Sequence, residues 1–262
     1  MQRKGYARKS LIPKEIQERL NQGHLPSANL VEWLSIDQKK LLKTWLQEQD
    51  AYELESMLLK QIASSNTQSV LQQAHLIAKA LHGYLNKDSY AHLWSSMIAH
   101  NSDMVRCWAA FCVPLNNTEL AQSVEAMRRF ACDTHFAVRE IAWLALRNEV
   151  VAHLREALDC LTPYTTDTDE NMRRFISEIT RPRGVWCKHI AELKQNPDIG
   201  LVLLEPLRAD PSRYVQNSVA NWLNDASKTQ PEWVKALTQR WQQQSNVPAT
   251  HYIIRRALRT IR

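Results

Sequence analysis

The sequence predicts an all-α fold: a right-handed α-solenoid built from about six stacked helical hairpins with a concave basic face. Two observations support this prediction. Only 5 of the 262 residues are glycine, and alternating runs rich in Val, Ile and Thr are scarce, whereas helix-favouring residues such as Leu, Ala, Gln, Glu, Lys and Arg are plentiful. In addition, a local pattern recurs along the chain at intervals of 33 to 43 residues, which is typical of stacked helical hairpins.

The recurring pattern is a polar turn followed by an apolar residue, an arginine and a small or apolar residue three positions later. Its key apolar positions, of which the first and last are weaker, are Val70, Val105, Val138, Met172, Val215 and Ile253. This period indicates HEAT-like units, each with an outer helix, a turn and an inner helix that begins at an Asp or Asn N-cap. Because one hairpin cannot bury its apolar stripe alone, neighbouring units are expected to stack.

The order of elements follows from the turn residues. Residues 1–28 contain two glycines and two prolines and are predicted to form a basic N-terminal arm with at most one short helix, whereas residues 29–262 are predicted to form one solenoid domain. Pro206 lies inside an apolar helical run and should kink it. The prolines expected between helices or in first turns are Pro114, Pro163, Pro211, Pro231 and Pro248.

The charge is concentrated at the two ends of the chain. Net charge is +6, and every charged residue in 233–262 is basic, whereas the middle of the chain is mildly acidic. This distribution favours a polyanion held at particular places, although a basic protein with a disordered basic tail fits the charge equally well.

Several other classes of protein and site are disfavoured. No run of 18 apolar residues exists, and the N-terminus lacks the apolar region of a secretory signal, so we expect no membrane contact. The five cysteines form no Cys-x-x-Cys pair, which predicts a reducing, cytoplasmic setting. The nine histidines are scattered, so we predict neither a metal nor a cofactor, and we expect a monomer.

One interval of the repeat is longer than the others because it contains the loop 181–186, Arg-Pro-Arg-Gly-Val-Trp. An irregular loop inside a regular solenoid is a candidate site. The residues that follow the key apolar positions are Arg106, Arg139 and Arg173, then Gln216. A row of guanidiniums on the concave face would match DNA phosphates. The alternative is that these arginines pair with an acid of the neighbouring repeat.

From about residue 133 onward the chain resembles the HEAT-like-repeat alkylpurine DNA glycosylases of the AlkC/AlkD superfamily, and it is closer to the AlkC branch. The segments that carry the resemblance are 135–139, 173–178 running into 181–186, 215–225 and 256–259. They cover about half of the chain, and the first 130 residues match only in architecture. The resemblance implies DNA alkylation repair, in which a glycosylase hydrolyses the N-glycosidic bond of cationic N3- or N7-alkylated purines in duplex DNA. No lysine is placed as a Schiff-base nucleophile, so we predict no lyase step and therefore a monofunctional enzyme.

The resemblance also implies site residues. A family tryptophan falls on Trp186, and an aspartate that follows an asparagine falls on Asp225. The chain departs from the AlkC pattern at His135, where the family has an acid, and it carries an acid at Glu140 instead. Either the catalytic acid has moved to Glu140, or the chain is a divergent member with altered activity.

The chemistry explains why carboxylates and indoles suit this reaction. An N3- or N7-alkylated purine is a cationic leaving group, so the enzyme needs negative charge near C1′, a positioned water and aromatic faces. We predict that Asp225 or Glu140 stabilises the oxocarbenium-like transition state, while Trp186 packs on the sugar or base with about 1–2 kcal/mol of cation–π attraction. The predicted DNA contacts are Arg139, Trp143, Arg173, Arg174, Arg181, Arg183, Lys188, Arg213 and His135.

Structural alternatives stay open for several of these residues. Trp143 and Trp222 fit core positions on their helices. Asp225 also fits an ordinary polar position at a helix end, and His135 fits a turn. For the whole chain, the alternatives are a non-catalytic HEAT-repeat protein that binds bent, branched or damaged DNA, and a protein-interaction scaffold. The sequence does not decide whether the base is flipped out of the duplex.

Overall fold

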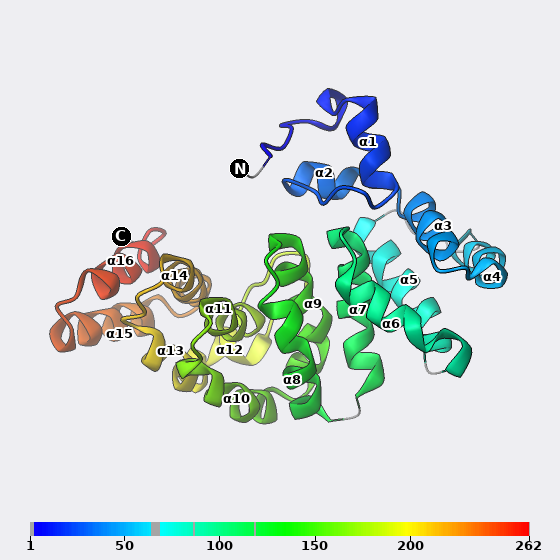
Figure 1. The fold of residues 1–262 in the computed structure, drawn as a ribbon. Coiled ribbons are helices and arrows are strands. Elements are labelled where there is room, and N and C mark those ends of the chain that lie inside the picture. Colours follow the sequence, from blue (N-terminus) through cyan, green and yellow to red (C-terminus); the bar gives the residue numbers. More distant parts are fainter. Residues whose placement is uncertain (1–2, 64–68, 86, 118, 262) are drawn as a thin grey trace. The chain divides into compact units, whose positions relative to one another are not determined.

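The computed structural model describes residues 3–63, 69–85, 87–117 and 119–261, and within these ranges the chain forms helices and loops without a strand (Figure 1). This confirms the predicted all-α, helical-repeat class. Unit 1 contains Met1–Asn117 and Asp133–Ile141, and unit 2 contains Thr118–Cys132 and Ala142–Arg262. The single domain expected over residues 29–262 stays a prediction. None of the helices in the described ranges combines the length and apolar character that a membrane crossing requires.

Unit 1 begins with the segment in which an N-terminal arm is predicted. Its described part is fastened to the unit: Leu20 is fully buried, and the Arg3 guanidinium donates to both carboxylate oxygens of Glu32, at 2.8 and 2.5 Å. The elements of unit 1 are η1 (Lys9–Leu11), α1 (Lys14–Asn21), α2 (Leu30–Ser35), α3 (Gln38–Glu48), α4 (Tyr52–Ala63), α5 (Val70–Leu85), η2 (Asp88–Tyr90), α6 (Ala91–Ala99) and α7 (Asp103–Asn116), together with the first turns of α9 (Phe136–Ala152).

The core of unit 1 is formed by helices that pack in chain order. Helices α3 and α4, α4 and α5, and α6 and α7 are neighbours, and α5 also packs on α7. Trp45 of α3 and Trp108 of α7 are fully buried, and their rings meet edge to face with centroids 6.4 Å apart. The Trp108 indole nitrogen donates to Gln38 Oε1 at 3.0 Å, which satisfies its buried N–H.

Unit 2 carries the long C-terminal series of hairpins. Helices α11, α14 and α16 pack one against the next, so that α14 lies between two helical neighbours (Figure 1). The elements of unit 2 are α8 (Leu120–Ala131), the rest of α9, α10 (Leu154–Leu161), η3 (Thr162–Thr166), α11 (Glu170–Ile179), α12 (Ala191–Gln195), η4 (Pro197–Gly200), α13 (Leu201–Leu207), α14 (Arg213–Ser227), α15 (Pro231–Gln244) and α16 (Pro248–Ala257).

The prolines mostly mark the helix boundaries. Pro231 and Pro248 are the first residues of α15 and α16, where the missing backbone N–H costs nothing. Pro206 lies inside α13, as expected from its apolar surroundings. Pro114 lies inside α7 and not between helices, so that expectation was wrong.

The polar turns of the repeat share one hydrogen-bonding device. Asp133, Asp167 and Asp210 each accept the backbone N–H two residues further on, at 2.7, 2.8 and 2.8 Å. Such turns order the chain just before an inner helix begins. Each carboxylate also receives a guanidinium from another helix in its own unit, and the three pairs are Arg106 with Asp133, Arg128 with Asp167, and Arg173 with Asp210. Arg106 and Arg173 are arginines of the recurring pattern, so this arginine has a structural use within the repeat.

Candidate active site

Asp225 lies near the C-terminal end of α14 and is only 3% exposed. Two side chains hold its carboxylate. Arg181, at the start of the loop that follows α11, places Nε 2.9 Å and Nη2 2.8 Å from Oδ2. Lys228 donates to Oδ1 at 3.1 Å. Both oxygens of the acid are therefore paired with a cation in the free protein.

A second buried carboxylate, Glu178 of α11, shares the Arg181 guanidinium. Arg181 Nη1 donates to Glu178 Oε2 at 3.2 Å, and Ser218 donates to Oε1 at 2.8 Å. Although burial lowers the pKa of Arg181, the charges of Glu178 and Asp225 outweigh it, and the pKa is raised overall. Glu178 was not among the predicted site residues, although its position three residues before Arg181 on a helix was a usable signal.

The loop after α11 is held by Arg147 of α9, whose side chain is 1% exposed. Its guanidinium donates to three backbone carbonyls, those of Ile179, Arg181 and Lys188; the last two lie 2.6 Å and 3.1 Å from Nη2. Burial lowers the pKa of this guanidinium from its ordinary value. This role could not be predicted from the sequence, because an arginine on a helix is usually exposed.

The tip of the loop presents Trp186 to solvent. Its side chain is 58% exposed, and its backbone adopts a left-handed φ of 62°, which is uncommon for a non-glycine residue. Gly184 is buried beside it, and a Cβ at this position would lie 2.3 Å from Cys187 Sγ. The turn therefore requires glycine and projects an indole outward.

The remaining predicted contacts of the loop differ in exposure. Lys188 has an exposed side chain, whereas Arg183 is half-buried and its Nε is buried without a hydrogen-bond partner in the described structure. Arg174 lies on α11 with its guanidinium 4.3 Å above the ring of Tyr214 and 3.6 Å from Glu178 Oε1.

The structure favours pairing within the fold over phosphate contact for the arginines of the repeat. Arg173 donates to both oxygens of Asp210, at 2.6 and 3.1 Å, and its third nitrogen donates to two carbonyls. Arg139 donates to the carbonyls of Asp133 and Thr134, at 2.7 and 3.0 Å. To reach DNA, Arg173 would have to leave a buried carboxylate.

His135 is likewise used inside unit 1, where it is 9% exposed. Its Nε2 lies 2.6 Å from the Ser27 carbonyl oxygen, which can only accept, so Nε2 carries the proton. Nδ1 accepts from the Ala137 amide at 3.2 Å and lies 3.5 Å from Asp103 Oδ2. These contacts favour the alternative of a turn histidine over the predicted phosphate contact.

The other predicted residues divide between the two units. Glu140 lies in unit 1, and Asp225 and Trp186 lie in unit 2, so the choice between the two acids stays a prediction. Trp143 is 4% exposed and Trp222 is fully buried, as the core alternative requires. Arg213 is exposed at the first turn of α14.

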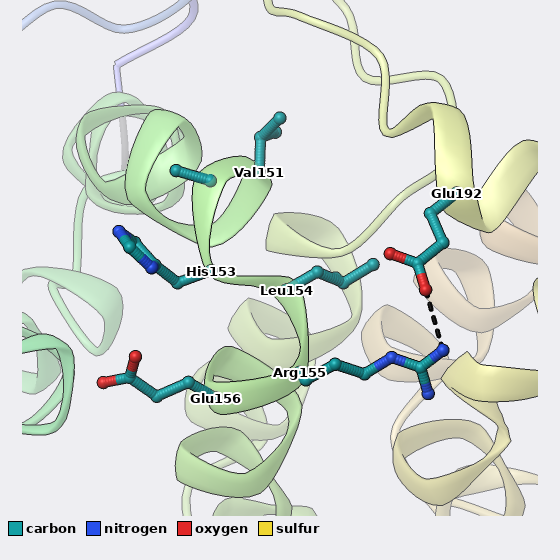
Figure 2. A pocket seen from close by; sticks show the side chains of 7 residues that line it. Val151, His153, Leu154, Arg155, Glu156 and Glu192 are labelled. Carbon is teal, nitrogen blue, oxygen red and sulfur yellow. Dashed lines mark hydrogen bonds and ion pairs between the residues drawn. The ribbon is translucent and has the colours of Figure 1, made fainter.

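A hollow lies elsewhere in unit 2, lined by the end of α9, the start of α10 and Glu192 of α12 (Figure 2). Its volume is about 370 Å³, and Arg155 Nη2 bonds Glu192 Oε1 beside it at 2.7 Å. None of the predicted site residues lines it. The lining residues are Val151, Ala152, His153, Leu154, Arg155, Glu156 and Glu192.

Comparison with known proteins shows which proteins this chain is similar to. No protein-family model matches the chain. YhaZ, an uncharacterised protein of Bacillus subtilis strain 168, is 35% identical over 140 residues, which are 53% of this chain and 37% of YhaZ. The solved structure of Pseudomonas fluorescens alkylpurine DNA glycosylase AlkC, bound to DNA containing an abasic site analog, matches with a TM-score of 0.67 and 28% identity over 85% of this chain. In sequence and fold the chain resembles the AlkC/AlkD-like superfamily.

A further solved structure is similar at the level of the fold. AlkD2 from Streptococcus mutans matches with a TM-score of 0.60 and 20% identity over 79% of this chain and 99% of its own. The AlkC match has both the higher TM-score and the higher identity, in keeping with the expected AlkC-like branch. This AlkC/AlkD-like chain spans 64% of the AlkC chain and 37% of YhaZ, less than two thirds of either.

Proposed function

We propose that this AlkC/AlkD-like protein acts in DNA alkylation repair, as a monofunctional glycosylase that hydrolyses the N-glycosidic bond of cationic N3- or N7-alkylated purines in duplex DNA. The observation that carries the proposal is the buried carboxylate of Asp225, which Arg181 holds at the start of the loop that presents Trp186. The likeness to AlkC, solved on DNA with an abasic site analog, supports DNA as the partner.

Asp225 suits the charge that develops in this reaction. When the bond from C1′ to the purine breaks, its electron pair leaves with the cationic base, which becomes neutral, and positive charge develops on the sugar. A fixed carboxylate stabilises that charge in a site with little water. Water then adds to C1′ and gives its proton to Asp225.

Arg181 and Lys228, the two cations paired with Asp225, have different proposed roles. Arg181 is 15% exposed and bonded to Glu178 as well, so it keeps Oδ2 in place. Lys228 is 44% exposed and bonds only Oδ1. In the proposed complex Lys228 moves to a phosphate and frees Oδ1 for the sugar or the water. Trp186 supplies the aromatic face for the sugar or the cationic base.

Release of free methylated bases from methylated duplex DNA tests the proposal. Wild type, Asp225→Asn and Glu140→Gln are compared, with duplex binding measured in parallel. We expect wild type to free methylated purine, and we expect Asp225→Asn to slow release about 100-fold or more with binding within about three-fold of wild type. Loss of release in Glu140→Gln alone would move the acid to Glu140.

A second candidate is a non-catalytic protein that binds bent, branched or damaged DNA. It is favoured by the pairing of both Asp225 oxygens and by the use of His135 inside unit 1. Wild-type protein that binds duplex DNA but frees no base would establish this candidate and reject the glycosylase. The monomeric state and the cytoplasmic location stay predictions.

A further inference from the structure

One side of α14 carries polar residues at every fourth position, namely Arg213, Asn217, Asn221 and Asp225. Residues at this spacing share one face of a helix. The stripe therefore leads from the first turn of α14 to the candidate carboxylate, over about 18 Å at about 1.5 Å per residue.

Helix α16 and the residues just after it face this stripe with a tyrosine and arginines. The Tyr252 hydroxyl donates to Asn217 Oδ1 at 2.7 Å, and Arg259 Nη2 donates to Asn221 Oδ1 at 3.1 Å. Three guanidiniums also lie close to the ring of Tyr252. Those of Arg213, Arg255 and Arg256 have Cζ 3.5, 5.5 and 5.7 Å from the ring centroid. We name Arg213, Tyr252, Arg255, Arg256 and Arg259 the α14–α16 track.

Among the residues that the structure describes, the arginines of the track have no carboxylate partner. Across the described residues, no ion pair joins any of the four to a carboxylate, and Arg256 Nε is buried without a hydrogen-bond partner. Burial lowers the pKa of Arg259, the neighbouring charge of Arg256 lowers it further, and the charge of Asp225 only partly offsets these effects. By contrast, Arg155, Arg208 and Arg240 of the same unit each pair with a glutamate.

Helix stabilisation explains only part of this arrangement. Arg255 and Arg256 lie in the last turn of α16, where cations interact favourably with the helix dipole. Arg213, however, is the first residue of α14, where the dipole disfavours a cation. An anion bound over Tyr252 would offset both this cost and the repulsion among the guanidiniums.

We propose that the α14–α16 track binds the phosphodiester backbone of one DNA strand, whether or not the DNA carries a lesion, and directs that strand toward Asp225. This inference rests on the proposed function. Because each strand of duplex DNA carries one phosphate per about 3.4 Å of helix axis, the stripe of about 18 Å from Arg213 to Asp225 spans roughly five phosphates of one strand. Aromatic stacking holds the guanidiniums in place and leaves their N–H groups for phosphate oxygens.

Salt-dependent binding of an undamaged duplex tests the track. The variant carries Arg213→Gln, Arg255→Gln and Arg256→Gln together. The matched control carries Arg155→Gln, Arg208→Gln and Arg240→Gln, which removes the same charge from paired arginines of unit 2. We expect the track variant to bind about 10- to 100-fold more weakly at low salt, and its slope of log K against log salt to be smaller by about 2–3, since each lost phosphate contact removes about 0.9. The control should bind as wild type does.

Equal binding and equal slopes for the two triple variants would overturn the proposal, and so would displacement of the duplex from wild type by polyglutamate of the same charge. Tyr252→Phe and Tyr252→Leu give a second readout without a change of charge. Phe keeps the ring and should bind as wild type, whereas Leu should weaken binding several-fold; equal binding by both would also overturn it. Thermal unfolding of each variant verifies that it is folded.

Base release separates this proposal from the glycosylase itself. If wild type frees no base but the track variant alone loses duplex binding, the track stands and the glycosylase is rejected. If wild type frees methylated bases and the track variant binds undamaged duplex as wild type does, the track is rejected and the glycosylase stands.

Discussion

Arg181 and Asp225 are joined by two contacts to one oxygen: Nε and Nη2 of the guanidinium lie 2.9 and 2.8 Å from Oδ2. The arginine belongs to the loop after α11 and the acid to α14, so this pair connects the loop to the helix. Arg181 was expected to clamp a phosphate, and the structure instead gives it a place between Glu178 and Asp225.

The pairing of Asp225 with Arg181 predicts that removing Arg181 lowers the free energy of unfolding more than removing Lys228 does. Arg181→Gln should lower the free energy of unfolding by about 2–4 kcal/mol, because it leaves two buried carboxylates without their shared counter-ion. Lys228→Gln should change it by less than about 0.5 kcal/mol, because the lysine is largely exposed. Urea unfolding measures both. Equal effects of the two substitutions would contradict the inner position of Arg181.

The hydrogen bonds of Arg147 predict that this residue keeps the loop after α11 ordered. Arg147→Met removes the guanidinium donors from three buried carbonyl contacts and should cost about 3 kcal/mol or more in unfolding free energy. A loosened loop should also expose the peptide bonds after Arg183 and Lys188 to trypsin. In Arg147→Met, cleavage at these bonds should therefore accelerate at least several-fold under native conditions. Arg155→Met, on the same unit and already exposed, is the control. Unchanged cleavage in Arg147→Met would show that other contacts order the loop.

His135 predicts a change of stability without a change of DNA binding. His135→Ala should lower the free energy of unfolding by about 1–3 kcal/mol, because the buried Ser27 carbonyl loses its donor. Duplex binding of the folded variant should stay within about two-fold of wild type. Weaker DNA binding at unchanged stability would instead restore the phosphate contact expected from the sequence.

The contact between Arg3 and Glu32 predicts a dependence of stability on pH. Burial favours the neutral acid, but hydrogen bonds from Arg3 and the Ala28 amide lower the pKa of Glu32 overall. A lowered carboxyl pKa stabilises the fold above the unfolded value of about 4.3, and this contribution is lost as pH falls through the folded pKa. Arg3→Gln should therefore be less stable than wild type at pH 7, by about 1 kcal/mol after solvent screening.

The same difference should shrink as pH falls below about 4, because Glu32 then becomes protonated in both proteins. Unfolding by urea at pH 7, 5 and 3 measures it. A difference that is constant over this range would mean that Arg3 stabilises unit 1 through packing and not through the charge of Glu32.

The sequence alone determined the class of the fold. Helix-favouring composition and the recurrence of a polar turn, an apolar residue and an arginine are local properties, and local properties set helices and their spacing. The polar turns of this recurrence contain Asp133, Asp167 and Asp210. The loop with Trp186 stood out because it interrupts the period. These features could be predicted without knowing which helices pack against one another.

Only the tertiary structure decided where each charge goes. Arg173 and Arg181 look alike in sequence, yet one pairs with the turn of the next repeat and the other with Asp225. Arg147 is buried on carbonyls, and Glu178 lies beside the candidate acid, because helices far apart in sequence meet there. A charged side chain takes the partner that compensates its lost hydration, and that partner is fixed by packing between distant segments.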